Sequence, residues 1–219
     1  SKKYGKPGTF GYADFIHDFT AKKWNPVKWA KLFKQSGAKL VVPVGEHHDG
    51  FAMWDSKLTK WDAKDKGPKR DIIGDLGKAV RAEGLKYAPS YHRERHFAYY
   101  LDHNQKWLDG SPFEGIHEEL KRNPELEEFY GPFQLSDEFI SDYKARWDEI
   151  SSKYKPDMMW LDGINVFKFH TDHPQVIKFR DTLRVMVTDY LNNGIKWDKE
   201  VVVNNKGQGP NFPLGFRLA

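Results

Sequence analysis

The sequence contains no cysteine, no long apolar run and no dense block of positive charge. Without cysteine, the chain can form neither a disulfide nor a metal site built from thiolates. No apolar run approaches the roughly 18 to 20 residues that a membrane-spanning helix needs. The formal net charge is +4, but basic and acidic residues are interspersed along the chain, which is not the pattern of a nucleic-acid-binding surface. We therefore expect no nucleic acid and no membrane among the partners of this chain.

Three enzyme motifs are also absent. The sequence has neither GxGxxG nor GxxxxGK[ST], the glycine-rich loops that bind dinucleotides and nucleotide phosphates, and it has no GxSxG motif for a serine nucleophile. The adjacent residues His47 and His48 lack the HxH or HExxH spacing that lets two imidazoles meet one ion, because neighbouring side chains of an extended chain point to opposite sides. We expect no metal and no other cofactor, although a metal-dependent hydrolase that uses His47, His48 and Asp162 remains an alternative.

What the sequence does contain is an alternation of short apolar runs with helical patterns. Its 39% hydrophobic and 15% aromatic residues are enough for a core in a chain of 219 residues. Buried strands are predicted at 39–44, 85–91, 157–161 and 200–203. Helices are predicted to begin after the capping residues Asn25, Asp71, Ser136 and His173, and the last is expected to stop at Gly194. Such an alternation is typical of parallel β/α units.

The fold class that follows is α/β, a (β/α) barrel of the TIM type. Eight strands and about 250 residues are typical of a closed barrel, so four predicted strands indicate a partial barrel that lacks terminal strands. We expect residues 1–219 to form a single catalytic domain or a fragment of one. Residues 96–135 are expected to be a loop insertion over the active face.

Chemically active side chains gather where the predicted strands end. In chain order they are Glu46, His47, His48 and Asp49, then Tyr91, His92, Arg93 and Glu94, then Trp160 and Asp162, and finally Asn204, Asn205 and Lys206. The carboxyl ends of parallel strands share one face, and active sites are built there. Sugars need polar groups for their hydroxyls and rings for their apolar faces, and glycoside hydrolysis needs two carboxyl groups. Asp162, beside Trp160 and followed by Gly163, is the candidate nucleophile.

Four motifs occur in order along the chain, namely EHHDGFAMWDS at 46–56, GPKRDIIGDL at 67–76, MMWLDG at 158–163 and VVVNNKG at 201–207. This set resembles the catalytic domain of the α-L-fucosidases of glycoside hydrolase family 29, over nearly the whole chain except the insertion after His96. The resemblance implies a (β/α)₈-like barrel and a retaining exo-glycosidase that hydrolyses terminal α-L-fucosyl linkages of fucosylated glycans or glycosides. It also implies a secreted, periplasmic or lysosome-like compartment.

The resemblance assigns roles residue by residue. The aspartate of WLDG makes Asp162 the nucleophile that forms a covalent fucosyl-enzyme, and the paired histidines make His47 and His48 ligands of sugar hydroxyls. The other residues expected at the sugar are Tyr91, His92, Trp160, Trp54 and Lys206, the last at a position where many members carry arginine.

The second carboxyl is where this sequence departs from the family pattern. The acid/base glutamate of the family normally follows the fourth motif, and this sequence has no glutamate after Glu200. Glu94 is the best remaining carboxyl, either as acid/base or as a residue that supports another group. The alternative is a non-catalytic, fucose-binding or inactive barrel fragment that needs a missing segment or a partner. Because an incomplete barrel exposes two sheet edges, we expect a homo-oligomer or a complementing chain.

Overall fold

A four-stranded parallel sheet lies at the centre of the structure. The computed structural model describes residues 3–6, 8–101, 112–162 and 172–206. The strand order of the sheet is β2 (Val44–Glu46), β4 (Ser90–Tyr91), β5 (Met158–Leu161) and β6 (Val202–Asn205). A second, two-stranded parallel sheet pairs β1 (Leu40–Val41) with β3 (Lys86–Tyr87). The four predicted strand positions and their parallel pairing are therefore confirmed.

Two of the predicted strands are each divided by a proline. Pro43 separates β1 from β2, and Pro89 separates β3 from β4. Proline has no N–H and cannot donate to a neighbouring strand, so the regular ladder is interrupted there. The proline carbonyls still accept, because Ser90 N–H donates to Pro43 and Trp160 N–H donates to Pro89. The divided strands thus continue across the break toward the same edge of the sheet.

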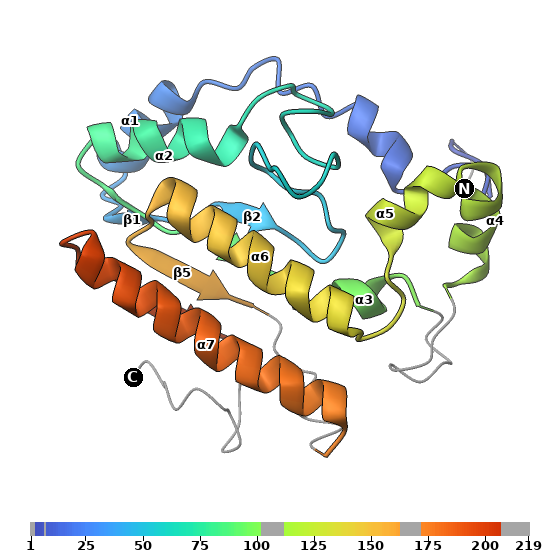
Figure 1. Ribbon diagram of the computed structural model, residues 1–219. Coiled ribbons are helices and arrows are strands. Elements are labelled where there is room, and N and C mark those ends of the chain that lie inside the picture. The colour runs from blue at the N-terminus through green and yellow to red at the C-terminus, as the bar shows by residue number, and fades with distance from the viewer. Residues whose placement is uncertain (1–2, 7, 102–111, 163–171, 207–219) are drawn as a thin grey trace.

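Four long helices accompany the strands, as predicted. They are α1 (Pro26–Gln35), α2 (Ile72–Ala82), α6 (Asp137–Tyr154) and α7 (Pro174–Lys196). In Figure 1, α6 and α7 lie side by side on one side of the sheet, and α1 packs beside α2. The predicted caps are confirmed, since the side chains of Asn25, Asp71, Ser136 and His173 each accept a backbone N–H of the first turn.

The end of α7 differs from its prediction. The helix passes Gly194 and ends at Lys196. The chain then folds back, and a Cβ on Gly194 would lie 2.5 Å from Cγ2 of Val201. Glycine at this position therefore allows the close approach of the returning chain and does not stop the helix.

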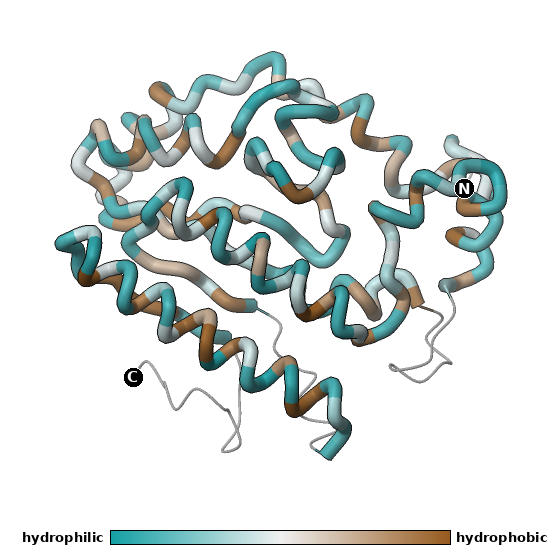
Figure 2. The backbone as a smooth tube through the Cα atoms, in the orientation of Figure 1, coloured by the Kyte–Doolittle hydropathy of each residue, from teal (hydrophilic) through white to brown (hydrophobic). Residues whose placement is uncertain are grey.

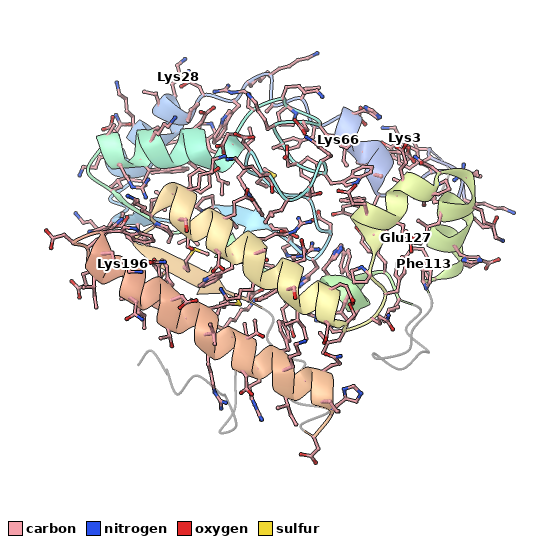
Figure 3. All side chains as sticks on the ribbon, viewed as in Figure 1. Lys3, Lys28, Lys66, Phe113, Glu127 and Lys196 are labelled. Carbon is pink, nitrogen blue, oxygen red and sulfur yellow. The ribbon has the colours of Figure 1, made fainter. Side chains whose placement is uncertain are left out.

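An aromatic stripe joins α6 to the core. Phe139, Tyr143 and Trp147 recur every four residues along the helix and are all buried. Hydrophobic and hydrophilic residues also alternate along α7 (Figure 2), as expected for a helix with one face on the core. Side chains fill the space between helices and sheet, while Lys28 of α1 and Lys196 of α7 lie at the outer margin of the molecule (Figure 3).

The described part of the predicted 96–135 insertion is mostly helical. It contains α3 (His96–Tyr99), α4 (Glu114–Arg122), η3 (Pro124–Leu126) and α5 (Glu127–Tyr130), which follow the short turn η2 (Arg93–Arg95). Residues of these helices share a second apolar cluster with Phe51 and Ile72. Tyr130 ties α5 to its surroundings, since its hydroxyl accepts from Ala13 N–H and donates to Glu119. The insertion thus has its own packing against the N-terminal part of the chain.

The parallel strands and their flanking helices form part of an α/β barrel, which is the predicted fold class. Within the described ranges, no helix is both long and apolar enough to cross a membrane.

Candidate active site

The strands of the larger sheet end at one edge, where side chains alternate between two faces. Ser90 pairs with Trp160, which pairs in turn with Asn204. His92, Asp162 and Lys206 each lie two residues after one of these three, in the same order. Side chains two apart on an extended chain point to the same side. These three residues are therefore delivered to one face, and their distances agree with this.

Asp162 lies at the centre of the group. Its Oδ2 is 2.9 Å from Nδ1 of His92, its Oδ1 is 3.0 Å from Nζ of Lys206, and its side chain is only 10% exposed. Burial raises the pKa of the Asp162 carboxyl, but the Lys206 ammonium and His92 outweigh burial, so this pKa lies below its usual value. Asp162 is therefore an ionised, partly desolvated carboxylate at neutral pH, which is the state that a nucleophile requires.

His92 is held at both ring nitrogens. Nδ1 faces Asp162, and Nε2 is 2.8 Å from the Ser90 hydroxyl oxygen. Burial, together with the neighbouring His47 and Lys206, lowers the pKa of His92 by more than Asp162 raises it, so the ring is neutral at neutral pH. A neutral ring satisfies both partners when Nδ1–H donates to Asp162 and the Ser90 hydroxyl donates to Nε2. His92 therefore fixes one carboxylate oxygen while Lys206 pairs with the other.

The histidine pair lies beside His92. The ring centroid of His47 is 4.4 Å from that of His48 and 4.8 Å from that of His92. Nδ1 of His48 donates to the backbone carbonyl of His92, and burial lowers the pKa of His48 to about 4. The His48 ring is thus neutral, and with its hydrogen on Nδ1 its Nε2 is an acceptor suited to a hydroxyl group. The ring of Tyr99 is 5.8 Å from that of His48, so α3 borders the cluster.

Two residues predicted to bind sugar lie elsewhere, and the structure corrects both assignments. Tyr91 points to the opposite face of the sheet from His92, where its ring packs against Tyr143 and its hydroxyl donates to the Tyr143 carbonyl. Trp54 is fully buried, and its Nε1–H donates to Glu149 of α6. Both rings belong to the packing against α6, because helix α6 covers that side of the sheet.

The predicted second carboxyl, Glu94, is fully buried in η2. After burial itself, the charge of Glu94 is the next cause of the raised pKa of the Tyr143 phenol, so this carboxyl lies close to α6. A general acid must reach the leaving oxygen of its substrate, and a fully buried carboxyl does not. Trp160, by contrast, is partly exposed and lies in the row of Ser90 and Asn204.

A buried charge network behind the histidine pair was not predicted. Glu46 is fully buried between Arg93 and Arg146, and both arginines also pair with Asp142 of α6. Two positive and two negative charges therefore join the end of β2, the turn after β4 and α6. The signal that could have revealed it is an acidic residue at the end of an apolar run, because a buried carboxylate needs a cationic partner. Ser90 was missed too, although its position two residues before His92 places both on one face.

Among the described residues, no group of three or more His, Cys, Asp or Glu side chains is placed to hold a metal ion. In the tautomers above, the Nδ1 atoms of His48 and His92 instead donate to a carbonyl and to a carboxylate. The arrangement places an anionic carboxylate beside neutral imidazoles and one ammonium group, which is the kind of site that can stabilise a carbon that becomes electron-poor.

The family model of α-L-fucosidase matches residues 1–212 of this sequence. The chain belongs to the α-L-fucosidase family. A human member, tissue α-L-fucosidase, is 36% identical over 160 residues, which cover 72% of this chain and 29% of the human protein. Tissue α-L-fucosidase of Rattus norvegicus is 35% identical over 164 residues, which cover 74% of this chain and 30% of the rat protein.

Solved α-L-fucosidases share the fold. The α-fucosidase of Thermotoga maritima in complex with fucose superposes with a TM-score of 0.63 at 31% identity, covering 97% of this chain and 42% of that protein. The α-L-fucosidases are glycoside hydrolases, so the family agrees with the chemistry of the cluster around Asp162. The chain spans 29–30% of the length of the two tissue α-L-fucosidases.

Proposed function

We propose that this chain carries the nucleophile and one sugar-binding wall of a retaining exo-α-L-fucosidase, with Asp162 as the nucleophile. The observation that carries the proposal is the ionised Asp162 held between His92 and Lys206 at the carboxyl ends of parallel strands. Its substrate would be a terminal α-L-fucosyl group on a glycan or glycoside. The family membership supports the substrate class, and the geometry of Asp162 supports the chemical role.

The reaction would proceed in two displacements. In the first, an oxygen of Asp162 attacks the anomeric carbon, the bond to the leaving group breaks, and the leaving oxygen takes a proton from a general acid. In the second, water gives a proton to a base and attacks the same carbon, which releases fucose and restores the carboxylate. Lys206 and His92 stabilise the carboxylate at the start and at the end of this cycle.

Sugar binding would use the side chains around the nucleophile. His48 presents a neutral acceptor for a hydroxyl, the tilted ring of His47 lies beside it, and Trp160 offers a partly exposed ring on β5, the strand that Asp162 follows. Helix α3, whose residue Tyr99 lies beside His48, would form one side of the pocket.

A second candidate function is fucose binding without turnover. The burial of Glu94 favours it, because the described residues then offer no accessible acid at the position predicted from the sequence. The two functions differ in whether a covalent bond to Asp162 forms.

An aryl α-L-fucoside with a dinitrophenyl leaving group separates them, because such a group departs without help from an acid. We expect the wild-type chain to release dinitrophenol and to gain the mass of one fucosyl group on the peptide that contains Asp162. Asp162→Gly should do neither, since it removes the attacking oxygen. Intact mass and peptide mapping measure the adduct, and absorbance measures the release.

Asp181→Asn, on the exposed face of α7, is the matched control and should behave as wild type. Equal rates for the wild-type chain and Asp162→Gly would overturn the proposed catalysis. Calorimetric binding of L-fucose without an adduct would support the second function, and no binding at all would count against both.

A further inference from the structure

Helix α3 packs against the turn that carries the histidine pair. His96, the first residue of α3, is 1% exposed, and its ring lies between two backbone carbonyls. Its Nδ1 is 2.9 Å from the His48 oxygen, and its Nε2 is 2.9 Å from the Gly131 oxygen. The ring therefore bridges the turn after β2 and the loop that follows α5.

Only one of the two carbonyls can receive a hydrogen bond from a neutral ring. A carbonyl oxygen only accepts, so each contact needs a hydrogen on the nitrogen that faces it. Burial, and after it Arg93, lower the pKa of His96 to about 3, so at neutral pH the ring carries a single N–H hydrogen. If this hydrogen is on Nδ1, the ring donates to the His48 carbonyl; if it is on Nε2, the ring donates to the Gly131 carbonyl.

The turn is shaped to receive this ring. Gly50 has a φ of 86°, and a Cβ at this position would lie 2.5 Å from Cε1 of His96. A side chain there would therefore displace the ring. Four residues after His96, Tyr100 donates its hydroxyl to the carbonyl of Asp49, and residues four apart on a helix lie on one face. The α3 segment thus contacts two consecutive carbonyls of the turn, those of His48 and Asp49.

We propose that His96 is a positioning residue for His48. With its hydrogen on Nδ1, His96 donates to the His48 carbonyl and fixes the direction in which the His48 imidazole presents Nε2 to a ligand. His96 touches no reacting atom. The inference rests on the proposed function for the identity of that ligand, whereas the position of the His48 ring can be measured with no ligand present.

Two substitutions separate the two contacts of His96. The side-chain nitrogen of asparagine takes the place of Nδ1, and that of glutamine takes the place of Nε2, so His96→Asn keeps the contact to His48 and His96→Gln keeps the contact to Gly131. We expect His96→Asn to preserve the imidazole NMR signals of His48, and His96→Gln to shift or broaden them. In the wild type, the nitrogen shifts of His96 should show the tautomer with hydrogen on Nδ1.

The measurement uses ¹H–¹⁵N correlation of the imidazoles in ¹⁵N-histidine-labelled protein, with His48 signals assigned from His48→Gln. Calorimetry with L-fucose gives the functional arm. We expect an affinity within about threefold of wild type for His96→Asn, and about tenfold weaker for His96→Gln, which corresponds to the loss of one hydrogen bond.

Tyr190→Phe is the control for general destabilisation. It removes a buried hydrogen bond from the Tyr190 hydroxyl to the Pro156 carbonyl, at the opposite end of β5, and should leave the His48 signals unchanged. Equal shifts in both His96 variants, no shift in either, or a wild-type His96 with hydrogen on Nε2 would overturn the proposal. If the His48 signals behave as expected but neither the wild type nor either His96 variant binds L-fucose, the proposed function fails and the positioning role stands.

Discussion

At the scale of single residues, an exposed side chain helps to hold the pKa of the Asp162 carboxyl low. Nζ of Lys206 is 3.0 Å from Oδ1 of Asp162, although the Lys206 side chain is 66% exposed. Burial acts in the opposite direction, because a charge withdrawn from water is disfavoured. The low pKa of Asp162 therefore depends in part on a lysine that solvent and salt can reach.

Lys206→Met should raise the pKa of Asp162, and Lys206→Arg should keep it low. The proposed attack requires an ionised Asp162, so the acid limb of kcat/KM for the proposed fucoside hydrolysis should move to higher pH in Lys206→Met. The low pKa of Asp162 also stabilises the fold above the unfolded value of about 3.9, and this contribution is lost as pH falls through the folded value. Carboxyl ¹³C NMR titration measures the pKa, and the difference between the variants should shrink in high salt. An acid limb and a titration that do not move in Lys206→Met would contradict this prediction.

The residues of the cluster were predictable from the strand ends, and their orientation was not. Asp162, His47 and His48 lie at or just beyond the ends of apolar runs, so a parallel fold had to bring them to one edge. Either Tyr91 or His92 can face the cluster, because side chains alternate along a strand. Which one does so depends on the phase of the strand, that is, on how it is aligned with its neighbours. That phase is set by the pairing of β4 with β5, which is a contact between segments far apart in the chain.

At the scale of elements, the charge network of Glu46 connects three parts of the fold. It joins β2 to the turn η2 through Arg93 and to α6 through Arg146 and Asp142. The side chains of Glu46 and both arginines are at most 5% exposed. The position of the histidine pair, directly after Glu46, is thus tied to α6 by buried ions.

Glu46→Gln should lower the free energy of unfolding by about 3 kcal/mol or more, because removing one partner leaves buried positive charge uncompensated. Chemical denaturation with matched slopes measures the change. Asp181→Asn breaks an exposed pair with Arg184 and should change stability by less than about 0.5 kcal/mol. Equal stabilities of Glu46→Gln and the wild type would show that the network contributes nothing.

Helix boundaries were more predictable than strand boundaries for a physical reason. A cap such as Asn25 or Ser136 acts within its own first turn, so its signal is local and readable. The breaks at Pro43 and Pro89 depend on which backbone groups face a neighbouring strand. Likewise, the burial of Trp54 is decided by α6, a helix that begins more than eighty residues later in the chain.

At the scale of the whole molecule, one margin of the sheet presents apolar side chains to solvent. Leu40, Val42 and Val44 are 38%, 38% and 43% exposed, and they alternate along the segment that forms β1 and β2. Among the described strands, β2 is at one end of the sheet order. Trp29 and Leu32 of the neighbouring α1 are exposed as well. An apolar face on a terminal strand favours association with another chain.

We expect the chain to self-associate through this margin as concentration rises. Placing lysines at Val42 and Val44 together should shift the population toward monomer, because charge on a terminal strand opposes pairing. Val185→Lys, at an exposed apolar position on α7, is the matched control and should not. Sedimentation velocity over a range of concentrations measures the distribution. A wild-type chain that stays monomeric throughout would contradict the prediction.

The contact between Lys206 and Asp162 also couples the pKa of Asp162 to the attachment of strand β6. Lys206 directly follows β6, whose attachment to β5 continues into the hydrogen bond from Lys206 N–H to the Leu161 carbonyl. Any change that loosens β6 moves the Lys206 ammonium away from Asp162 and raises the pKa of Asp162. Thermodynamic linkage is reciprocal, so protonating Asp162 must loosen β6 by the same free energy. The protonation of Asp162 and the attachment of β6 are therefore linked, and a titration of this carboxyl measures how firmly β6 is held.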